Sequence, residues 1–272
     1  MRPMRLRQLA LATLLALSFA GPAVSASCGN DSSGFEAWIT DFKPQAVQQG
    51  ISARTVDAAL NNASYSRATI RLDRNQKVFK QSFEQFSGRM IPPRIGRAKS
   101  MLNKHASIFE RVESQFGVPK EVVVAIWGLE TDFGAVSSNN SILSAVATLA
   151  YDCRRSDFFR GQLIDALRII ERGDLTPAQM VGGLHGEIGQ TQFLPSSYVA
   201  FAVDFDGNGR ADLIRSTSDV LASTANYLRG HGWRSGAPWT PGTANFNVIK
   251  SWNKSDVYSR TVAEFARRLA EG

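Results

Sequence analysis

Apolar residues recur at intervals of three and four along most of this chain, which is the spacing of one face of an α-helix. Residues 97–116 carry such a stripe opposite lysine, glutamate and arginine. Residues 157–172 and 218–231 repeat the pattern, and each of the three segments is followed at once by a glycine, a common helix terminator. Alternation with period two is scarce. The pattern therefore predicts a mainly α-helical protein.

The segment EVVVAIWGLE, residues 121–130, is apolar on every side until its last residue. Such a helix is expected to be buried, with Pro119 in its first turn. Residues 33–90 also have helical spacing but are more polar. The Ile91-Pro92-Pro93 stretch is the best boundary between an N-terminal helical part, 27–92, and a catalytic domain, 93–272. We expect the two parts to form one continuous globular unit.

Glu130 is a carboxylate in an unusual place, at the C-terminal end of this buried helix. Desolvation disfavours the charged form, and so does the negative pole of the helix. Both effects raise the pKa, as a general acid working near neutral pH requires. The structural alternative is a helix-end glutamate paired with an arginine, and spacing alone does not separate the two.

Composition narrows the function classes. The 272 residues include 31 Lys+Arg and 24 Asp+Glu, for a formal charge of +7, with 43% hydrophobic residues, as in an ordinary globular protein. Two cysteines exclude a disulfide-dense scaffold or a four-cysteine metal site. The three histidines are far apart and lack the HExxH spacing, which argues against a zinc hydrolase.

Residues 1–26 have the three parts of a signal peptide: a basic start, a short apolar core and small residues before a cleavage point after Ala26. The apolar core is too short for a stable membrane span. A lipoprotein is an alternative because Cys28 follows, but Ser25 stands where a lipobox has a branched aliphatic residue. A first helix of the fold is a further alternative. We expect a periplasmic protein.

Removal of residues 1–26 takes away three arginines and no acid, which leaves a modest charge of +4. The surplus is scattered and suits an anionic polymer, but there is no nucleic-acid motif. Outside the cytosol, Cys28 and Cys153 are expected to form one disulfide, the alternative being two buried thiols. We expect a monomer.

The segment GEIGQTQFLPSSY, residues 186–198, combines glycines with Gln190 and Gln192. Neutral amide donors and acceptors suit carbohydrate hydroxyl and N-acetyl groups. A polar turn between helices is the alternative interpretation.

The segment DFDGNGRAD, residues 204–212, matches the first nine positions of an EF-hand loop. Position 12 is Arg215 rather than glutamate, which excludes a standard EF-hand, but Asp219 would close a longer loop. An Asx-rich turn without metal is the alternative. The expected Ca²⁺ ligands are Asp204, Asp206, Asn208, Arg210 and Asp219.

In this order the segments resemble the lytic murein transglycosylase B family, glycoside hydrolase family 103, from about Phe35 to Tyr258. The strongest matches are FGVPKEVVVAIWGLETDFG, ATLAYDCRRSDFF, GEIGQTQFLPSSYVAFAVDFDGNGRADL and ANYLRGHGW. The resemblance implies a lysozyme-like helical catalytic domain with an EF-hand-like calcium loop and a groove for peptidoglycan glycan strands. It implies Glu130 as the catalytic acid. The residues it implies at the substrate are Arg154, Arg155, Gln192, Tyr227, Asn253 and Tyr258, and we add Gln190.

This chain departs from the family at Gly183-Leu184-His185, where many members have a Ser or a Trp together with an Ala before the GxxG motif. A hydroxyl that helps some members to hold the substrate N-acetyl group therefore has no counterpart at Gly183. Cys153 is also unusual for the family at its own position, and a disulfide from it would reach the groove wall.

The resemblance implies a non-hydrolytic lyase that forms 1,6-anhydro-N-acetylmuramic acid. A hydrolytic muramidase would need a second carboxylate, and we found no motif that supplies one; Asp132 is expected to point away. A non-catalytic peptidoglycan-binding scaffold is the third possibility.

Overall fold

The computed structural model describes residues 27–75 and 81–272; the expected signal peptide lies outside these residues. The described chain is mainly helical, with one short antiparallel pair in which Asn140 faces Gly182 and Ser141 faces Val181. Its elements are α1 (Phe35–Gln48), α2 (Ala53–Leu60), α3 (Arg67–Arg74), α4 (Phe83–Met90), α5 (Pro92–Lys104), α6 (Ala106–Phe116), α7 (Lys120–Thr131), β1 (Asn140–Ser141), α8 (Ile142–Tyr151), α9 (Ser156–Glu171), the 3₁₀ turn η1 (Pro177–Gln179), β2 (Val181–Gly182), α10 (Pro195–Phe201), α11 (Thr217–Gly230), α12 (Ala244–Trp252) and α13 (Asp256–Ala270).

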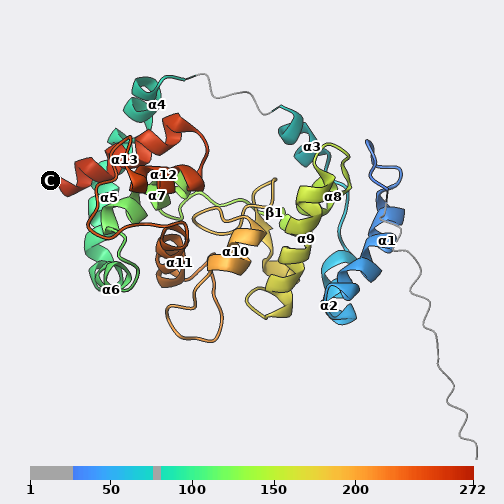
Figure 1. Ribbon diagram of the computed structural model, residues 1–272. Coiled ribbons are helices and arrows are strands. Elements are labelled where there is room, and N and C mark those ends of the chain that lie inside the picture. Colours follow the sequence, from blue (N-terminus) through green and yellow to red (C-terminus); the bar gives the residue numbers. More distant parts are fainter. Residues whose placement is uncertain (1–26, 76–80) are drawn as a thin grey trace, which may run out of the picture.

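The apolar helix expected from the sequence is α7, and every residue from Val122 to Leu129 is buried. It packs against α13, α5, α11 and α6, while α8 packs against α9 and α10 covers α9. Figure 1 shows these as two helical groups, with α10 and the β1 region between them. Residues of α7 and α12 line a cavity together with residues of α9, and this is where the candidate site lies.

The prediction of one helix over 97–116 is wrong in one respect, because the structure divides this segment at His105 into α5 and α6. The backbone of His105 leaves the helical region, with φ −114° and ψ 26°, and its ring packs edge-on against Trp127. The α6 half keeps a buried stripe, and Gly117 ends it in the left-handed conformation with φ 69°. The stripe on α5 is only partly buried.

Helices of the 27–92 stretch pack on both groups. Helices α1, α2 and α3 contact α8 or α9, whereas α4 contacts α5 and α13 (Figure 1). Ile91 is fully buried and Pro92 begins α5. A disulfide joins Cys28 to Cys153 at the start of the described chain.

In the part of the chain that the structure describes, no helix has the length and apolar character needed to traverse a bilayer.

Candidate active site

Glu130 lies in the last turn of α7, and two side chains from the C-terminal helices hold its carboxylate. The indole Nε1 of Trp252 donates a hydrogen bond to Oε1 at 2.9 Å, and the hydroxyl of Tyr258 donates to the same oxygen at 2.6 Å. Both donors are neutral, so the carboxylate is held without the arginine of the alternative interpretation. A proton on Glu130 therefore belongs on Oε2, since Oε1 already accepts twice.

Burial raises the pKa of Glu130 above its usual value. The hydrogen bonds from Tyr258 and Trp252 oppose this shift, and the charge of Glu187 adds to it. The net pKa is raised, which is the direction derived from the sequence. A carboxyl group of this kind can be protonated when a substrate arrives and ionised later, as acid–base catalysis requires.

Glu130 opens into a cavity of about 510 Å³ that lies between the two helical groups. Its lining combines aromatic rings with several polar groups, an arrangement that suits a ligand-binding site. The lining residues are Glu130, Arg155, Phe158, Phe159, His185, Glu187, Gln192, Phe193, Leu194, Ser197, Tyr227, Ser251, Trp252 and Asn253.

Three aromatic rings support one side of this cavity. The ring of Trp252 meets Phe193 at 5.3 Å and Tyr227 at 4.8 Å between centroids, both edge-to-face. The hydroxyl of Tyr227 donates to the carbonyl of Ser251 at 2.8 Å. These contacts fix the plane of Trp252 and so the direction of its hydrogen bond to Glu130.

The residues that the sequence predicted at the substrate are mostly brought together. Arg155, Gln192, Tyr227 and Asn253 line the cavity, and Tyr258 contacts Glu130 directly. Arg154 lies instead in an adjoining cavity, which Arg155 and Phe158 also line.

The Gln190 side chain is not among the residues that line this cavity. Its Oε1 accepts from the Trp127 indole at 2.9 Å, and its Nε2 donates to the carbonyl of Ile214 at 3.0 Å. Both ends of the amide are used to join α7 to the loop before α11. These bonds give Gln190 a structural role, and its substrate contact stays a prediction.

A second carboxylate, Glu187, lines the same cavity as Glu130, contrary to the expectation that none would be found there. Its neighbour His185 places Nδ1 at 3.4 Å from Glu187 and Nε2 at 3.6 Å from the buried Asp73. Asp73 also forms ion pairs with Arg154 and Arg155. Asp132 points away, as expected, because it pairs with Arg97 at 2.9 Å and Arg94 at 3.7 Å.

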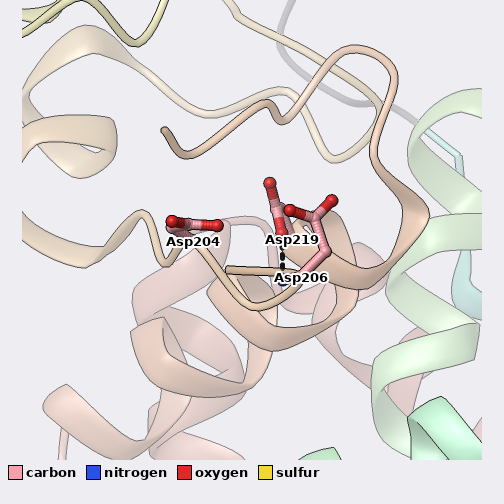
Figure 2. A group of neighbouring side chains, drawn as sticks. All are labelled: Asp204, Asp206 and Asp219. Atoms are coloured by element: carbon pink, nitrogen blue, oxygen red, sulfur yellow. Dashed lines mark hydrogen bonds between the residues drawn. The ribbon is translucent and has the colours of Figure 1, made fainter. Parts of the chain in front are cut away.

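The EF-hand-like segment forms an acidic cluster, shown in Figure 2. One carboxylate oxygen each of Asp204, Asp206 and Asp219 lies within 4.8 Å of the others. Three carboxylates at this spacing are a donor set that fits a hard cation such as Ca²⁺. The residue that closes the cluster is Asp219 at the start of α11, as the sequence predicted, rather than position 12 of a standard loop.

Backbone amides support this cluster. Asp204 accepts hydrogen bonds from the amides of Gly207, Asn208 and Gly209. Asp219 accepts from three further loop amides, and burial raises its pKa. Asp212, at EF-hand position 9, caps the following turn instead, and the Asn208 side chain accepts from the Arg210 amide.

Comparison with known proteins now identifies the family. The model of the transglycosylase SLT domain matches residues 34–243. The chain belongs to this family. It is 36% identical to the membrane-bound lytic murein transglycosylase B of Escherichia coli (strain K12) over 148 residues, which are 54% of this chain and 41% of that protein. The matched region thus spans less than half the length of that relative.

Solved structures of the transglycosylase family share this fold. SltB3 from Pseudomonas aeruginosa, in complex with NAG-NAM-pentapeptide, superposes with a TM-score of 0.83 at 30% identity, over 88% of this chain and 80% of that one. Its complex with NAG-anhNAM-pentapeptide gives 0.82 at the same identity and coverage. The Escherichia coli lytic transglycosylase Slt35 in complex with calcium gives 0.75 at 24% identity, over 90% and 96% of the two chains, which shows a common fold.

Several residues of this candidate site were not found from the sequence. Trp252, the neighbour of the predicted Asn253, donates to Glu130. For Phe158 and Phe193, the aromatic side chain was the only feature of the sequence that could have indicated a place in the site. Glu187 and His185 stood inside quoted motifs, but the chain gives no signal that the loop folds their side chains toward Glu130.

Proposed function

We propose that this protein is a peptidoglycan lytic transglycosylase that cleaves the β-1,4 bond between N-acetylmuramic acid and N-acetylglucosamine. The observation that carries the proposal is the half-buried carboxyl of Glu130, with its raised pKa, at the edge of an aromatic-lined cavity. Membership in the transglycosylase SLT domain family supports the reaction. The complexes of SltB3 with muropeptides support the substrate class.

In the first step, protonated Glu130 gives its proton to the glycosidic oxygen, and the bond from that oxygen to muramoyl C1 breaks. The N-acetyl group of the same sugar supports the positive charge at C1, as in substrate-assisted glycosidases. Trp252 and Tyr258 then stabilise the glutamate anion through their bonds to Oε1.

In the second step, the muramoyl C6 hydroxyl attacks C1 of the same sugar. Its oxygen bonds to C1 and its proton passes to Glu130, which restores the acid. The product is 1,6-anhydro-N-acetylmuramic acid. An intramolecular hydroxyl competes well with water because it is already held near C1.

Glycan binding is assigned to the residues around Glu130. Tyr227 offers an aromatic surface, Gln192 and Asn253 offer amides, and Arg155 offers a cation for acidic groups of the polymer. Arg154 extends this positive surface into the adjoining cavity. We assign Tyr258 to the support of Glu130 rather than to direct glycan contact.

The acidic cluster is proposed to hold one structural Ca²⁺. Asp204, Asp206 and Asp219 would supply carboxylate oxygens, with Asn208 and Arg210 completing the loop. A bound ion would neutralise mutual repulsion and fix the loop ahead of α11. It takes no part in proton transfer.

Residues 1–26 are proposed to direct export to the periplasm, where Cys28 and Cys153 stay oxidised. The helices of 27–92 and of 93–272 are proposed to act as one globular unit, since a single core cluster runs through both. The working form is proposed to be a monomer.

A hydrolytic muramidase is the second candidate, and one observation favours it. Glu187 places a second carboxylate in the cavity, and a carboxylate opposite the acid is what water activation requires. The muramidase would release a reducing sugar instead of the anhydro sugar.

Glu130→Gln tests the role of the acid. Gln keeps the shape but carries no transferable proton, and we expect lysis of purified sacculi to fall by more than about 10²–10⁴-fold. The matched control is Glu110→Gln, which alters an exposed glutamate on α6. Equal turbidity loss by Glu130→Gln and the control would reject the proposed function.

A further inference from the structure

The loop between β2 and α10 gives the cavity a rigidly held carboxylate. The backbone amide of His185 donates to Glu187 Oε2 at 2.9 Å, and the His185 ring lies 3.4 Å from Oε1. The carbonyl of Glu187 accepts from the Gly183 amide at 2.9 Å. Both carboxylate oxygens and the backbone of Glu187 are therefore fixed by the same short loop.

Gly183 leaves the space that this carboxylate occupies. A Cβ atom at this position would overlap the carboxylate of Glu187. Any side chain at 183 would displace Glu187 without removing its charge. The glycine is thus required by the placement of Glu187.

His185 is held between two acids. Its Nδ1 faces Glu187 and its Nε2 lies 3.6 Å from Asp73, whose side chain is only 2% exposed. Asp73 in turn pairs with Arg154 and Arg155. The His185 ring is thereby fixed beside Glu187, where its hydrogen bond and charge favour the ionised form of that carboxylate.

Glu130 and Glu187 are therefore prepared for different tasks in one cavity. Burial raises the pKa of Glu130. Burial also acts to raise the pKa of Glu187, but the hydrogen bonds and charge of His185 outweigh it, and the net pKa is lowered. Two carboxyl groups whose environments separate their pKa values are the usual sign of an acid and its ionised partner.

We propose that Glu187 is the second carboxylate of the reaction: it stays ionised and stabilises the positive charge that develops at muramoyl C1. His185 and Asp73 are its positioning residues. This inference rests on the proposed function, and it assigns Glu187 an electrostatic role rather than activation of water. No bond to Glu187 forms, and the proton still travels only between Glu130 and the substrate.

The pH dependence follows from the groups around the pair. These are Glu130 from α7, Asp73 from α3, Arg155 before α9, Tyr227 from α11 and Tyr258 from α13. The reaction needs Glu187 ionised, which sets the acidic limb of the kcat profile, and Glu130 protonated, which sets the basic limb. Removing the charge of Glu187 lowers the pKa of Glu130, so the basic limb moves to lower pH.

The test measures kcat, KM and their pH profiles on purified sacculi for Glu187→Gln, with Glu110→Gln as control and thermal melting as the check on folding. We expect about a hundredfold loss in kcat for Glu187→Gln, the size of removing one preorganised electrostatic group. The products should remain anhydro sugars. Gly183→Ala should lower kcat by displacing the carboxylate, and His185→Gln should move the acidic limb to higher pH.

Unchanged kcat and an unchanged basic limb in folded Glu187→Gln would overturn the inference. A wild type that makes reducible products, with Glu187→Gln shifted to anhydro products, would also overturn it, because Glu187 would then be a base for water. If Glu130→Gln is inactive in the same assay, the first result removes only the role of Glu187, whereas reducible wild-type products would also reject the transglycosylase reaction. If Glu130→Gln retains full activity, the proposed function itself fails.

Discussion

The cavity around Glu130 and the acidic cluster of Asp204, Asp206 and Asp219 both contain carboxylates. The two regions differ in the hydrogen-bond donors that these carboxylates receive. In the cluster, backbone amides of the loop donate to Asp204 and Asp219. In the cavity, Glu130 receives two neutral side-chain donors on a single oxygen. The first arrangement gives Asp204 and Asp219 three amide donors each, and the second gives Glu130 two side-chain donors.

This difference distinguishes the proposed structural cation site from the proposed catalytic site. Many amide donors keep a carboxylate ionised and ready to meet a cation. Burial with few donors brings the two protonation states of Glu130 closer in free energy, as a proton carrier needs. Asp219 is fully buried and its pKa is raised too, and we expect a bound cation to lower that pKa.

The largest expected effect concerns the cluster. Saturating Ca²⁺ should stabilise the folded protein by about 2.7 kcal/mol at a hundredfold excess over Kd, measured as a rise in Tm. Asp204→Asn should lose this response, whereas Asp57→Asn, which alters an exposed aspartate on α2, should keep it. Identical melting curves in chelator and in millimolar Ca²⁺ would show that the cluster binds no calcium.

The next effect concerns the cavity. Tyr258→Phe removes a hydrogen bond that lowers the pKa of Glu130, so the basic limb of the activity profile should move to higher pH. The glutamate anion formed in the first step also loses a donor, so kcat should fall about tenfold. Tyr227→Phe loses a bond to a carbonyl instead, and its profile should keep the wild-type limbs. Identical limbs in the two variants would contradict the role of Tyr258.

The smallest effect is on stability. Because the pKa of Glu130 is raised on folding, this group contributes stability at pH values below its unfolded pKa. That contribution is lost as pH rises through the folded pKa. Gln does not titrate, so the Tm of Glu130→Gln should exceed that of wild type by an amount that grows over this pH window. We expect about 1 kcal/mol, or 2–4 °C, at neutral pH. A difference that is constant with pH would contradict the burial argument.

The sequence predicted the parts of this molecule that depend on local pattern. The buried helix α7, the glycine that ends α6 and the spacing of the acidic cluster all follow from neighbours along the chain. The break at His105 was not predicted, because the apolar stripe continues across it and the ring of Trp127 that it contacts is distant in sequence.

The parts that depend on distant contacts were mostly beyond sequence reasoning. Trp252 reaches Glu130 across 122 positions. The hydrogen bond from the Trp127 indole to the Gln190 amide oxygen depends on how α7 packs against the loop after β2. Glu187 was visible as a residue type, but only the fold of its loop places it in the cavity.

The most direct test of the central claim is the chemistry of the released muropeptides. Purified sacculi are digested with the full chain, half of the digest is reduced with borohydride, and the masses are compared. If Glu130 takes the proton of the muramoyl C6 hydroxyl as that oxygen attacks C1, the main products end in the 1,6-anhydro sugar. These products are lighter by one water than hydrolysis products, and their masses do not change on reduction. Main products that gain two hydrogens on reduction would contradict the account and identify a hydrolase.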